Sequence, residues 1–410
     1  MPTAVRFDAY DPAFVRDPYP TYRRLLAETP VFHDDTWGLT FFARHSDVTS
    51  ILRDRRFGRD IRHVVPVDEI DPRTYPRHLP NWYRMVRGSF IDLEPPEHTR
   101  IRSHVSRSFT KRRVEEMRAD VEAAVTRAFD ALADGEEVDL VADLATPVPI
   151  TVIAEMMGVP ASDHQMLLDW SHAIVRVFDL NVTPDEEAAA EQATIEFSDH
   201  LRGLVAQRRA DPGDDLISHL VHEDDPLDED DLVATCILVL NAGHEATVHA
   251  IGNGMLALAR NPGALDALRA DPEIAETAVE ELLRYDPPLH MFERWVLEDL
   301  EWDGVQLKTG DKLGLLFGAA NHDPEVFDEP DTLDLTRDPN PHIAFGMGIH
   351  LCVGAPLARL ELEAVFATLA RRYRSIDLVG DEPPRTPSLV FRGPDSLPAR
   401  LVPAGPAPTS

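Results

Sequence analysis

The sequence contains little cysteine, little lysine and no long apolar run, and each shortage argues against a class of protein. Two cysteines among 410 residues do not supply a disulfide framework, and they favour a reducing cytoplasm. Only three residues are lysine, and the net charge of −32 disfavours nucleic acid and anionic membranes as partners. No stretch approaches the roughly 20 apolar residues of a spanning helix, and no signal peptide is expected.

What is present is mainly helical periodicity with a minor β component. Most of 95–260 has helical spacing of apolar residues, and 229–260 predicts one long helix that follows an acidic run. The stretch 60–90 predicts a long irregular loop. Further elements are expected as a shorter helix at about 273–285 and as strand-like or turn segments at 1–40, 292–316 and 388–402. No composition break divides the chain, so we expect one domain over 1–410.

Within the long helix, the segment NAGHEATVHAIGN places His244, Glu245 and His249 in apolar surroundings. Zinc peptidases carry two histidines four residues apart, on one helical face, beside a glutamate. Here the histidines are five residues apart, so they point roughly 140° away from each other at about 100° per residue. One ion could not be chelated by both without breaking the helix. The spacing disfavours a peptidase-type zinc site, and a helix with one polar stripe remains open.

A second motif lies in HIAFGMGIHLCVGAPLARLE, where Phe345, Gly348, Cys352 and Gly354 have the spacing F-x-x-G-x-x-x-C-x-G. Gly348 would permit a tight turn, and Gly354 would allow the backbone to approach a flat group closely. A helix is predicted directly afterwards, so Cys352 lies at its N-terminus, where amides and the dipole favour a thiolate. One thiolate without neighbouring ligands is a poor zinc site and a good single axial ligand.

This loop resembles the signature of bacterial cytochromes P450, the haem-thiolate monooxygenases, and the similarity extends over roughly 15–405. The resemblance implies the cytochrome P450 fold, mainly α with a minor β region. It also implies haem b (iron protoporphyrin IX) as cofactor, with Cys352 as the iron ligand and Phe345 and Gly354 beside it.

The resemblance covers a structural motif. Glu281 and Arg284 match the E-x-x-R of the family, and two residues at this spacing can pair on a helix. Arg337 would complete a buried Glu–Arg–Arg cluster that supports the haem pocket. By itself, such a pair usually lies exposed on the surface and contributes little. Its position before the cysteine loop is what supports the resemblance.

The haem propionates need cations and hydrogen-bond donors. The resemblance assigns them to His98 and Arg102, which share one helical face, and to Arg294 and His350. Arginine forms charge-assisted bonds to carboxylates. For His98, the alternative is a role as a helix cap.

The long helix would cross the distal face of the haem and handle O2. Ala242 and Gly243 would allow close approach, and Glu245 occupies the acidic position. The usual threonine, whose hydroxyl helps to deliver protons, is replaced by Ala246, with Thr247 one residue later. Protons could come through water held by Thr247 and Glu245 or through a substrate hydroxyl. We prefer these two routes because Thr247 lies about 100° around the helix from Ala246. The alternatives are chemistry that needs this alcohol less, such as peroxide-driven oxidation, and a helix bulge that lets Thr247 act.

Substrate contacts are implied in five segments of the chain and are mostly apolar, so a hydrophobic small molecule is expected. They are Trp82, Phe90, Ile91, Phe178, Leu240, Ala246, Leu289, His290, Met291, Val390 and Phe391. Of these, His290 would supply one polar contact.

Because no flavin or ferredoxin module is recognisable in the chain, electrons are expected from a separate ferredoxin and its ferredoxin reductase. A set of basic residues would steer an acidic donor to the thiolate side, although ordinary solvated arginines would look the same. They are Arg100, Arg107, Lys111, Arg112, Arg113, Arg359, Arg371 and Arg372.

The expected protein is therefore a cytoplasmic monomer that hydroxylates or epoxidises a hydrophobic compound with O2. Two alternatives stay open. One is a haem-thiolate enzyme of oxidative coupling, desaturation or peroxide-driven oxidation. The other is a haem-binding protein without catalysis.

Overall fold

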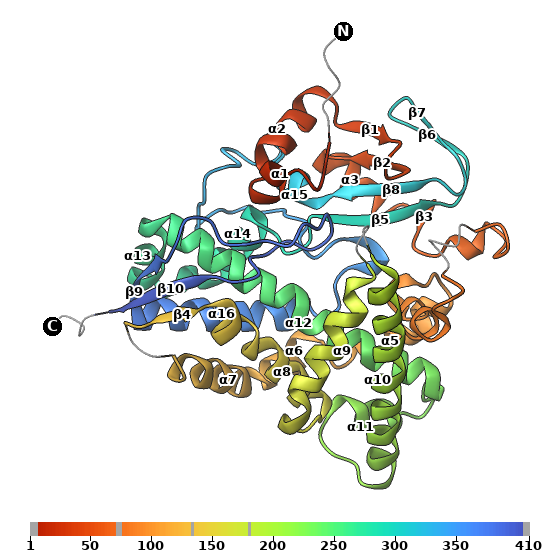
Figure 1. The fold of residues 1–410 in the computed structure, drawn as a ribbon, viewed down its shortest axis with the longest axis horizontal. Coiled ribbons are helices and arrows are strands. Elements are labelled where there is room, and N and C mark those ends of the chain that lie inside the picture. The colour runs from red at the N-terminus through yellow and green to blue at the C-terminus, as the bar shows by residue number, and fades with distance from the viewer. Residues whose placement is uncertain (1–6, 71–75, 133–134, 179–181, 405–410) are drawn as a thin grey trace.

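The computed structural model describes residues 7–70, 76–132, 135–178 and 182–404, and these are mainly helical with small sheets (Figure 1). The helices are α1 (Pro12–Arg16), α2 (Tyr19–Glu28), α3 (His45–Ile51), α4 (Pro80–Trp82), α5 (Glu97–Ser106), α6 (Lys111–Glu116), α7 (Arg118–Asp130), α8 (Pro147–Met157), α9 (His164–Arg176), α10 (Pro184–Ala210), α11 (Leu216–Val221), α12 (Glu229–Arg260), α13 (Pro262–Ala270), α14 (Ala275–Tyr285), α15 (Phe317–Ala320) and α16 (Ala355–Arg372). The strands are β1 (Val31–Asp34), β2 (Leu39–Phe42), β3 (Phe57–Gly58), β4 (Glu137–Asp139), β5 (Met291–Val296), β6 (Leu300–Trp302), β7 (Val305–Leu307), β8 (Lys312–Leu316), β9 (Tyr373–Leu378) and β10 (Pro398–Pro403).

The larger sheet has five strands in the order β1-β2-β8-β5-β3 and lies with α1, α2, α3 and α15 at the top of Figure 1. Strands β2 and β8 pair in parallel, and the other neighbours are antiparallel. Adjacent residues of a strand point to opposite faces. Phe41 and Phe42 of β2 accordingly pack into two different apolar clusters, so this sheet is buried on both faces.

The long helix α12 is the centre of the helical part, and α8, α10, α14 and α16 pack against it. The Asp228 side chain caps its N-terminus by accepting from the amide of Asp231, and acidic residues fill the first turn. Gly254 lies where the helix meets α16, because a Cβ there would stand 2.3 Å from Cζ of Phe366. The bounds predicted for this helix are confirmed.

Other expectations are confirmed only in part. Residues 7–42 form helices α1 and α2, which were not expected, as well as strands β1 and β2. Helix α13 was not expected, and it begins at Pro262 because proline suits the first turn of a helix. In the loop expected at 60–90, residues 71–75 lie outside the described ranges, and a π-helical turn spans Tyr83–Arg87. Within the described ranges, no helix combines the length and apolarity needed to cross a bilayer.

Candidate active site

One cavity lies where α12, the start of α16, strand β5 and the segment around Phe90 meet, and its lining is mostly apolar. It brings together most of the site residues expected from the sequence. These are Phe90, Ile91, Arg102, Phe178, Ala242, Gly243, Glu245, Ala246, Thr247, Leu289, Met291, Arg294, Phe345, His350, Cys352, Gly354, Val390 and Phe391.

The cysteine loop is held by its own backbone. Gly348 has φ +72, and a Cβ there would lie 2.2 Å from the carbonyl oxygen of Leu52, so the predicted tight turn requires glycine. The amide of Cys352 donates to the carbonyl of Phe345 at 3.0 Å, which closes the loop. The thiol of Cys352 is thereby fixed at the cavity wall.

The electrostatics of the thiol differ from the expectation. Burial raises the pKa of Cys352, and the amides of Gly354 and Ala355 with the charge of Arg102 offset this effect only partly. The amides at the helix N-terminus thus favour the thiolate, as predicted, but burial, which the sequence did not reveal, opposes them. A coordinating metal removes the proton of a thiol outright, so ionisation at this site depends on the ligand.

Buried donors with unused hydrogen-bonding capacity gather at one side of the cavity, where Nε2 of His350 lies 3.7 Å from Oε1 of Glu94. Arg294 is 2% exposed, and burial together with nearby Arg59 lowers its pKa to about 9. The rings of His98 and His350 stack with centroids 4.5 Å apart, and none of their four nitrogens has a hydrogen-bond partner among the described residues. Orphaned buried donors are costly unless a ligand satisfies them. This donor set fits the anionic carboxylates of a haem.

Two of the expected propionate contacts are placed differently from the others. His98 lies behind His350 and does not itself line the cavity. Its nitrogens form no hydrogen bond, so it does not cap its helix either, and burial lowers its pKa to about 4. Arg102 lines the cavity, but its guanidinium donates to the carbonyl of Leu351. Arg102 thus lies beside the cysteine loop.

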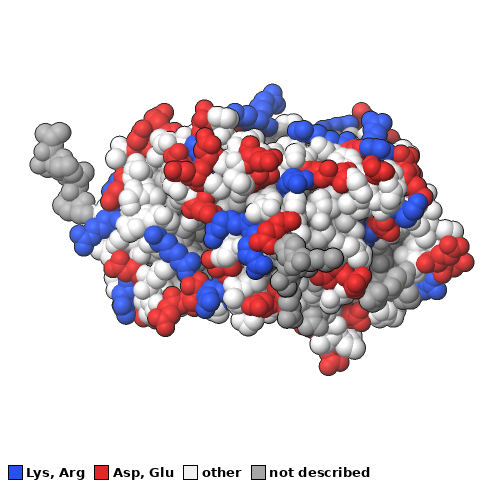
Figure 2. Space-filling model, turned by 90° about the horizontal axis from the view of Figure 1, so that it is seen from above, with Lys and Arg blue, Asp and Glu red and all other residues white. Residues whose placement is uncertain are grey.

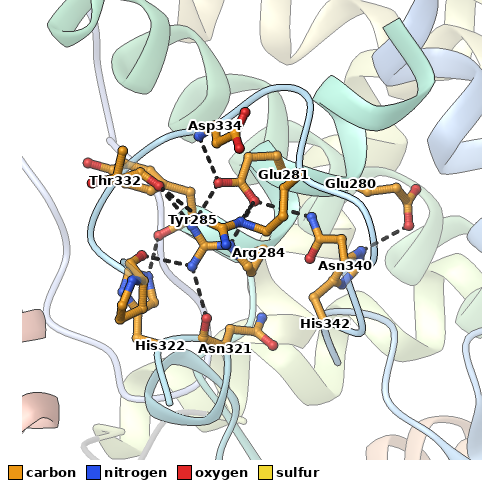
Figure 3. Close-up of polar contacts among 12 residues, drawn as sticks. Glu280, Glu281, Arg284, Tyr285, Asn321, His322, Thr332, Asp334, Asn340 and His342 are labelled. Carbon is orange, nitrogen blue, oxygen red and sulfur yellow. Dashed lines mark hydrogen bonds and ion pairs between the residues drawn. The ribbon is translucent and has the colours of Figure 1, made fainter. Parts of the chain in front are cut away.

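The Glu–Arg–Arg motif forms a buried cluster, shown in Figure 3. Glu281 and Arg284 are both 0% exposed, and Arg284 donates to both carboxylate oxygens at 2.7 and 2.8 Å. Arg337 donates to the same carboxylate at 3.1 Å. Arg284 also donates to the carbonyl of Asn321 at 3.0 Å, and the Asn321 side chain accepts from the amide of Ile343 at 2.9 Å. The cluster therefore anchors α14 to the segment that leads into the cysteine loop.

Helix α12 passes the cavity without a bulge. The hydroxyl of Thr247 donates to the carbonyl of Gly243 at 3.3 Å, one turn earlier in its own helix. The suggestion that a bulge brings Thr247 into the position of Ala246 is therefore wrong. Gly243 has a packing role, because a Cβ there would lie 2.6 Å from Cγ1 of Ile153 on α8.

Glu245 borders the cavity and lies between two imidazoles. Its Oε1 is 3.4 Å from Nε2 of His244 and 3.5 Å from Nε2 of His172 on α9. Burial opposes its ionisation, but the nearby imidazoles outweigh burial and hold the pKa of Glu245 below its usual value. The ring of His249 points elsewhere and packs near Phe391. Glu245 is therefore ionised at neutral pH.

Three expected substrate contacts do not line the cavity. Trp82 is buried and donates from its indole to the carbonyl of Ile174 at 3.1 Å. Leu240 is also buried, in the core on another side of α12. His290 contacts the hydroxyl of Tyr22 at 3.0 Å, and burial lowers its pKa to about 4. The polar substrate contact expected from His290 is therefore wrong, because its ring is used in the fold.

Sequence reasoning missed five ionisable residues of the cavity wall, which are Arg59, Arg87, Asp92, Glu293 and Glu361. Glu361 on α16 is 1% exposed, its Oε2 has no partner among the described residues, and burial raises its pKa well above the usual value. Its place between Leu360 and Leu362 in a buried helix was a usable signal. Arg59 lines the cavity and pairs with buried Asp92. No local pattern pointed to Arg59.

Much of the basic set expected on the thiolate side is paired with acids. Arg107 lies 3.0 Å from Glu223, and Arg372 lies 2.6 Å from Asp130. Figure 2 shows that acidic and basic side chains also alternate on the face seen there. The remaining pairs are Arg100–Asp231, Arg112–Glu116, Arg113–Glu116 and Arg359–Glu280. These pairs reduce the net positive charge that the set presents.

The cavity, its single cysteine and the orphaned donors together define the site of a haem-thiolate oxidoreductase. A family model described as cytochrome P450 matches residues 61–396. The chain belongs to the cytochrome P450 family, whose cofactor is haem b, and it is an oxidoreductase of the monooxygenase type.

Relatives of known name are similar over nearly their whole length. The polyketide biosynthesis cytochrome P450 PksS of Bacillus subtilis (strain 168) is 35% identical over 96% of this chain and 98% of its own. Its solved structure superposes with a TM-score of 0.87 at 33% identity, covering 97% of this chain and 100% of that one. The cytochrome P450 monooxygenase PikC of Streptomyces venezuelae is 37% identical, over 97% of this chain and 94% of its own. The structure of CxnD, a cytochrome P450 for C–S bond formation in chuangxinmycin biosynthesis, has a TM-score of 0.86 at 32% identity. The match covers 96% of this chain and 98% of that one.

Proposed function

We propose that this enzyme hydroxylates or epoxidises a hydrophobic small molecule of bacterial secondary metabolism, using O2 and electrons from a separate ferredoxin. The observation that carries the proposal is one cavity shared by the Cys352 thiol, an apolar wall and the ionised Glu245. The name of PksS, which assigns that relative to polyketide biosynthesis, supports the substrate class.

In this proposal Cys352 ligates the iron, and Arg294 and His350 bind the propionates. Haem bound in this way supplies O2 chemistry, with electron donation from the thiolate favouring O–O cleavage. Phe345 and Gly354 also line the cavity, and a Cβ at Gly354 would meet only Sγ of Cys352, at 4.0 Å. Arg102, which lies close to the thiol, stabilises its ionised form.

The apolar part of the wall holds the substrate. Its aromatic and aliphatic side chains gain roughly 25 cal/mol for each Å² of apolar surface that the substrate buries. They are Phe90, Ile91, Phe178, Leu289, Met291, Val390 and Phe391. Bound substrate also excludes water from this wall.

Proton delivery is proposed to pass through Glu245, whose ionised carboxylate first takes up a proton from solvent by way of the exposed His172 and then releases it at the cavity. Ala246 offers no hydroxyl, and the hydroxyl of Thr247 is engaged with the carbonyl of Gly243. The next donor in line is therefore ordered water or a hydroxyl of the substrate itself.

A second candidate is oxidative coupling, desaturation or peroxide-driven oxidation. Ala246 favours it, because such chemistry needs less proton delivery from the distal helix. The printed title of the CxnD structure, which names C–S bond formation, also favours it. Product formation with hydrogen peroxide alone, at a rate equal to that with O2 and a ferredoxin, would select this candidate.

The primary test is spectroscopic. Reduced protein treated with CO should give the strongly red-shifted Soret band of thiolate-ligated haem, and Cys352→His should lose that band while keeping haem. A Soret band without this red shift in freshly prepared wild-type protein would refute both enzymatic candidates. Compounds that convert the haem from low to high spin should then be oxidised in turnover assays with O2, ferredoxin and ferredoxin reductase.

The electron donor is proposed to be a small acidic ferredoxin, and the enzyme a cytoplasmic monomer. Arg107 and Arg112 are 66% and 83% exposed, so they remain available to a partner despite their acidic neighbours. Added salt should therefore slow reduction by ferredoxin, because screening weakens attraction between exposed charges. A rate of reduction that does not change with salt would count against this docking mode.

A further inference from the structure

The distal helix carries a second cluster of ligating groups, outside the expected haem contacts. One ring nitrogen each of His172 and His244 and a carboxylate oxygen of Glu245 all lie within 4.8 Å of one another. His172 comes from α9 and the other two residues from α12, so the cluster bridges two helices. The spacing of His244 and His249 argued against a metal site within α12, and α9 supplies the second imidazole instead.

The distances within the cluster suit a shared ion better than hydrogen bonds. Oε1 of Glu245 is 3.4 Å from the His244 nitrogen and 3.5 Å from the His172 nitrogen. A tetrahedral zinc ion with bonds of about 2.0–2.1 Å separates its ligand atoms by about 3.3–3.4 Å. Among the described residues, neither Nε2 of His244 nor Oε1 of Glu245 has a hydrogen-bond partner.

The orientation of His244 is set by a contact of the kind that supports metal ligands. Its Nδ1 lies 2.8 Å from the carbonyl oxygen of Leu240, which can only accept, so Nδ1 carries the proton. The neutral ring therefore turns the lone pair of Nε2 toward Glu245, whereas a cationic ring would donate to the carboxylate. A ligating histidine commonly donates its other N–H to such a carbonyl. His244 is 1% exposed, so this unsatisfied nitrogen is fully buried.

We propose that His172, His244 and Glu245 bind one zinc ion or a similar divalent transition-metal ion. Two imidazoles and one carboxylate form a ligand set that zinc accepts, with a fourth position open to water. The His172 side chain is 59% exposed, which gives the ion a path from solvent. Hard ions such as Mg²⁺, which prefer oxygen ligands, should not compete.

Occupancy of this site would affect the reaction. The ion takes the Glu245 carboxylate, which then no longer accepts and releases protons at the cavity. Zinc should therefore lower the fraction of NAD(P)H consumption that yields product. This consequence rests on the role proposed for Glu245, whereas the binding itself does not.

Binding can be measured by calorimetric titration of tag-free holoenzyme with Zn²⁺. Wild type should bind one ion that His172→Gln and His244→Gln bind at least about tenfold more weakly. His78→Gln is the matched control, because His78 is 58% exposed and lies 2.9 Å from Glu187, much as His172 lies near Glu245. Retention of thiolate–CO spectra shows that each variant is folded.

The outcomes separate the site from its effect. Equal zinc affinity in wild type, His172→Gln and His244→Gln would overturn the site, as would equal binding of Mg²⁺. Zinc that lowers coupling in wild type and His78→Gln but not in His172→Gln supports both parts. Binding that needs His172 yet leaves coupling unchanged would keep the metal site and refute the role proposed for Glu245.

Discussion

Two buried carboxylates in this enzyme have opposite surroundings. Glu281 accepts hydrogen bonds from Arg284, Arg337, Asn340 and the amide of Asp334, so both of its oxygens are satisfied. Oε1 of Glu245 has no hydrogen-bond partner among the described residues. The Glu281 side chain is 0% exposed and that of Glu245 is 13% exposed, and only Glu281 has hydrogen bonds to both of its oxygens.

The difference separates a structural charge from a functional one. A buried ion pair with complete hydrogen bonding fixes the geometry of its surroundings, and loss of one partner leaves an uncompensated charge. A buried carboxylate with an unsatisfied oxygen keeps capacity for a proton or an ion, and such groups concentrate at functional sites. Substitution should therefore damage folding in the first cluster and chemistry in the second.

The largest effect is expected for Glu281→Gln. The neutral amide leaves the buried guanidinium of Arg284 without its counter-charge, which should lower the free energy of unfolding by about 3–5 kcal/mol. Urea denaturation followed by circular dichroism measures the loss, and the haem content of purified protein should fall with it.

The control is Arg23→Gln, which removes a pair between side chains that are 49% and 47% exposed, Arg23 and Asp331. Its effect should stay within about 0.5 kcal/mol. If Glu281→Gln were as mild as this control, the buried cluster would not be the anchor of the cysteine loop.

Glu245→Gln should impair the reaction and leave the fold nearly intact. Product formation should fall by about 10²-fold, because an amide cannot relay protons as a carboxylate does. The free energy of unfolding should fall by no more than about 1 kcal/mol, because the imidazoles stabilise the charge of Glu245 only modestly beyond the cost of its burial. Stopped-flow reduction, NAD(P)H consumption and product yield measured together distinguish lost coupling from lost electron supply. Tightly coupled turnover in this variant would refute the proposed role and favour peroxide-type chemistry.

The cluster around Glu281 and the cysteine loop could be predicted from the sequence, because their residues form motifs with fixed local spacing. Glu281 and Arg284 are one helical turn apart, and Cys352 lies in a loop whose turn requires Gly348. The prediction of α12 was equally local, since it follows from apolar residues at helical spacing after an acidic run.

The cluster of His172, His244 and Glu245 could not be predicted, because its geometry depends on how helices pack. His172 reaches Glu245 only where α9 crosses α12, and nothing near His172 in the sequence marks that contact. The same limit applies to His290, whose ring was expected at the substrate. Its partners Tyr22 and Asp286 come from α2 and the end of α14.

The smallest effect is expected at a carboxylate of intermediate burial, Glu280, which neighbours Glu281 but is 27% exposed. Burial opposes its ionisation, but Arg359 and His342 outweigh burial and lower its pKa to about 2 from the usual 4.5. A lowered pKa contributes stability that is present above pH 4.5 and is lost as the pH falls toward 2. After allowance for solvent screening, Glu280→Gln should cost about 1–2 kcal/mol at neutral pH.

Urea unfolding at several pH values measures this dependence. The difference in unfolding free energy between wild type and Glu280→Gln should shrink below pH 4.5 and approach zero near pH 2. A difference that stays constant with pH would mean that packing of the side chain, and not its charge, stabilises the protein. If its charge stabilises the protein, Glu280 is intermediate between Glu281 and Glu245 in its contribution to stability. Its carboxylate has hydrogen-bond partners, but solvent weakens those interactions.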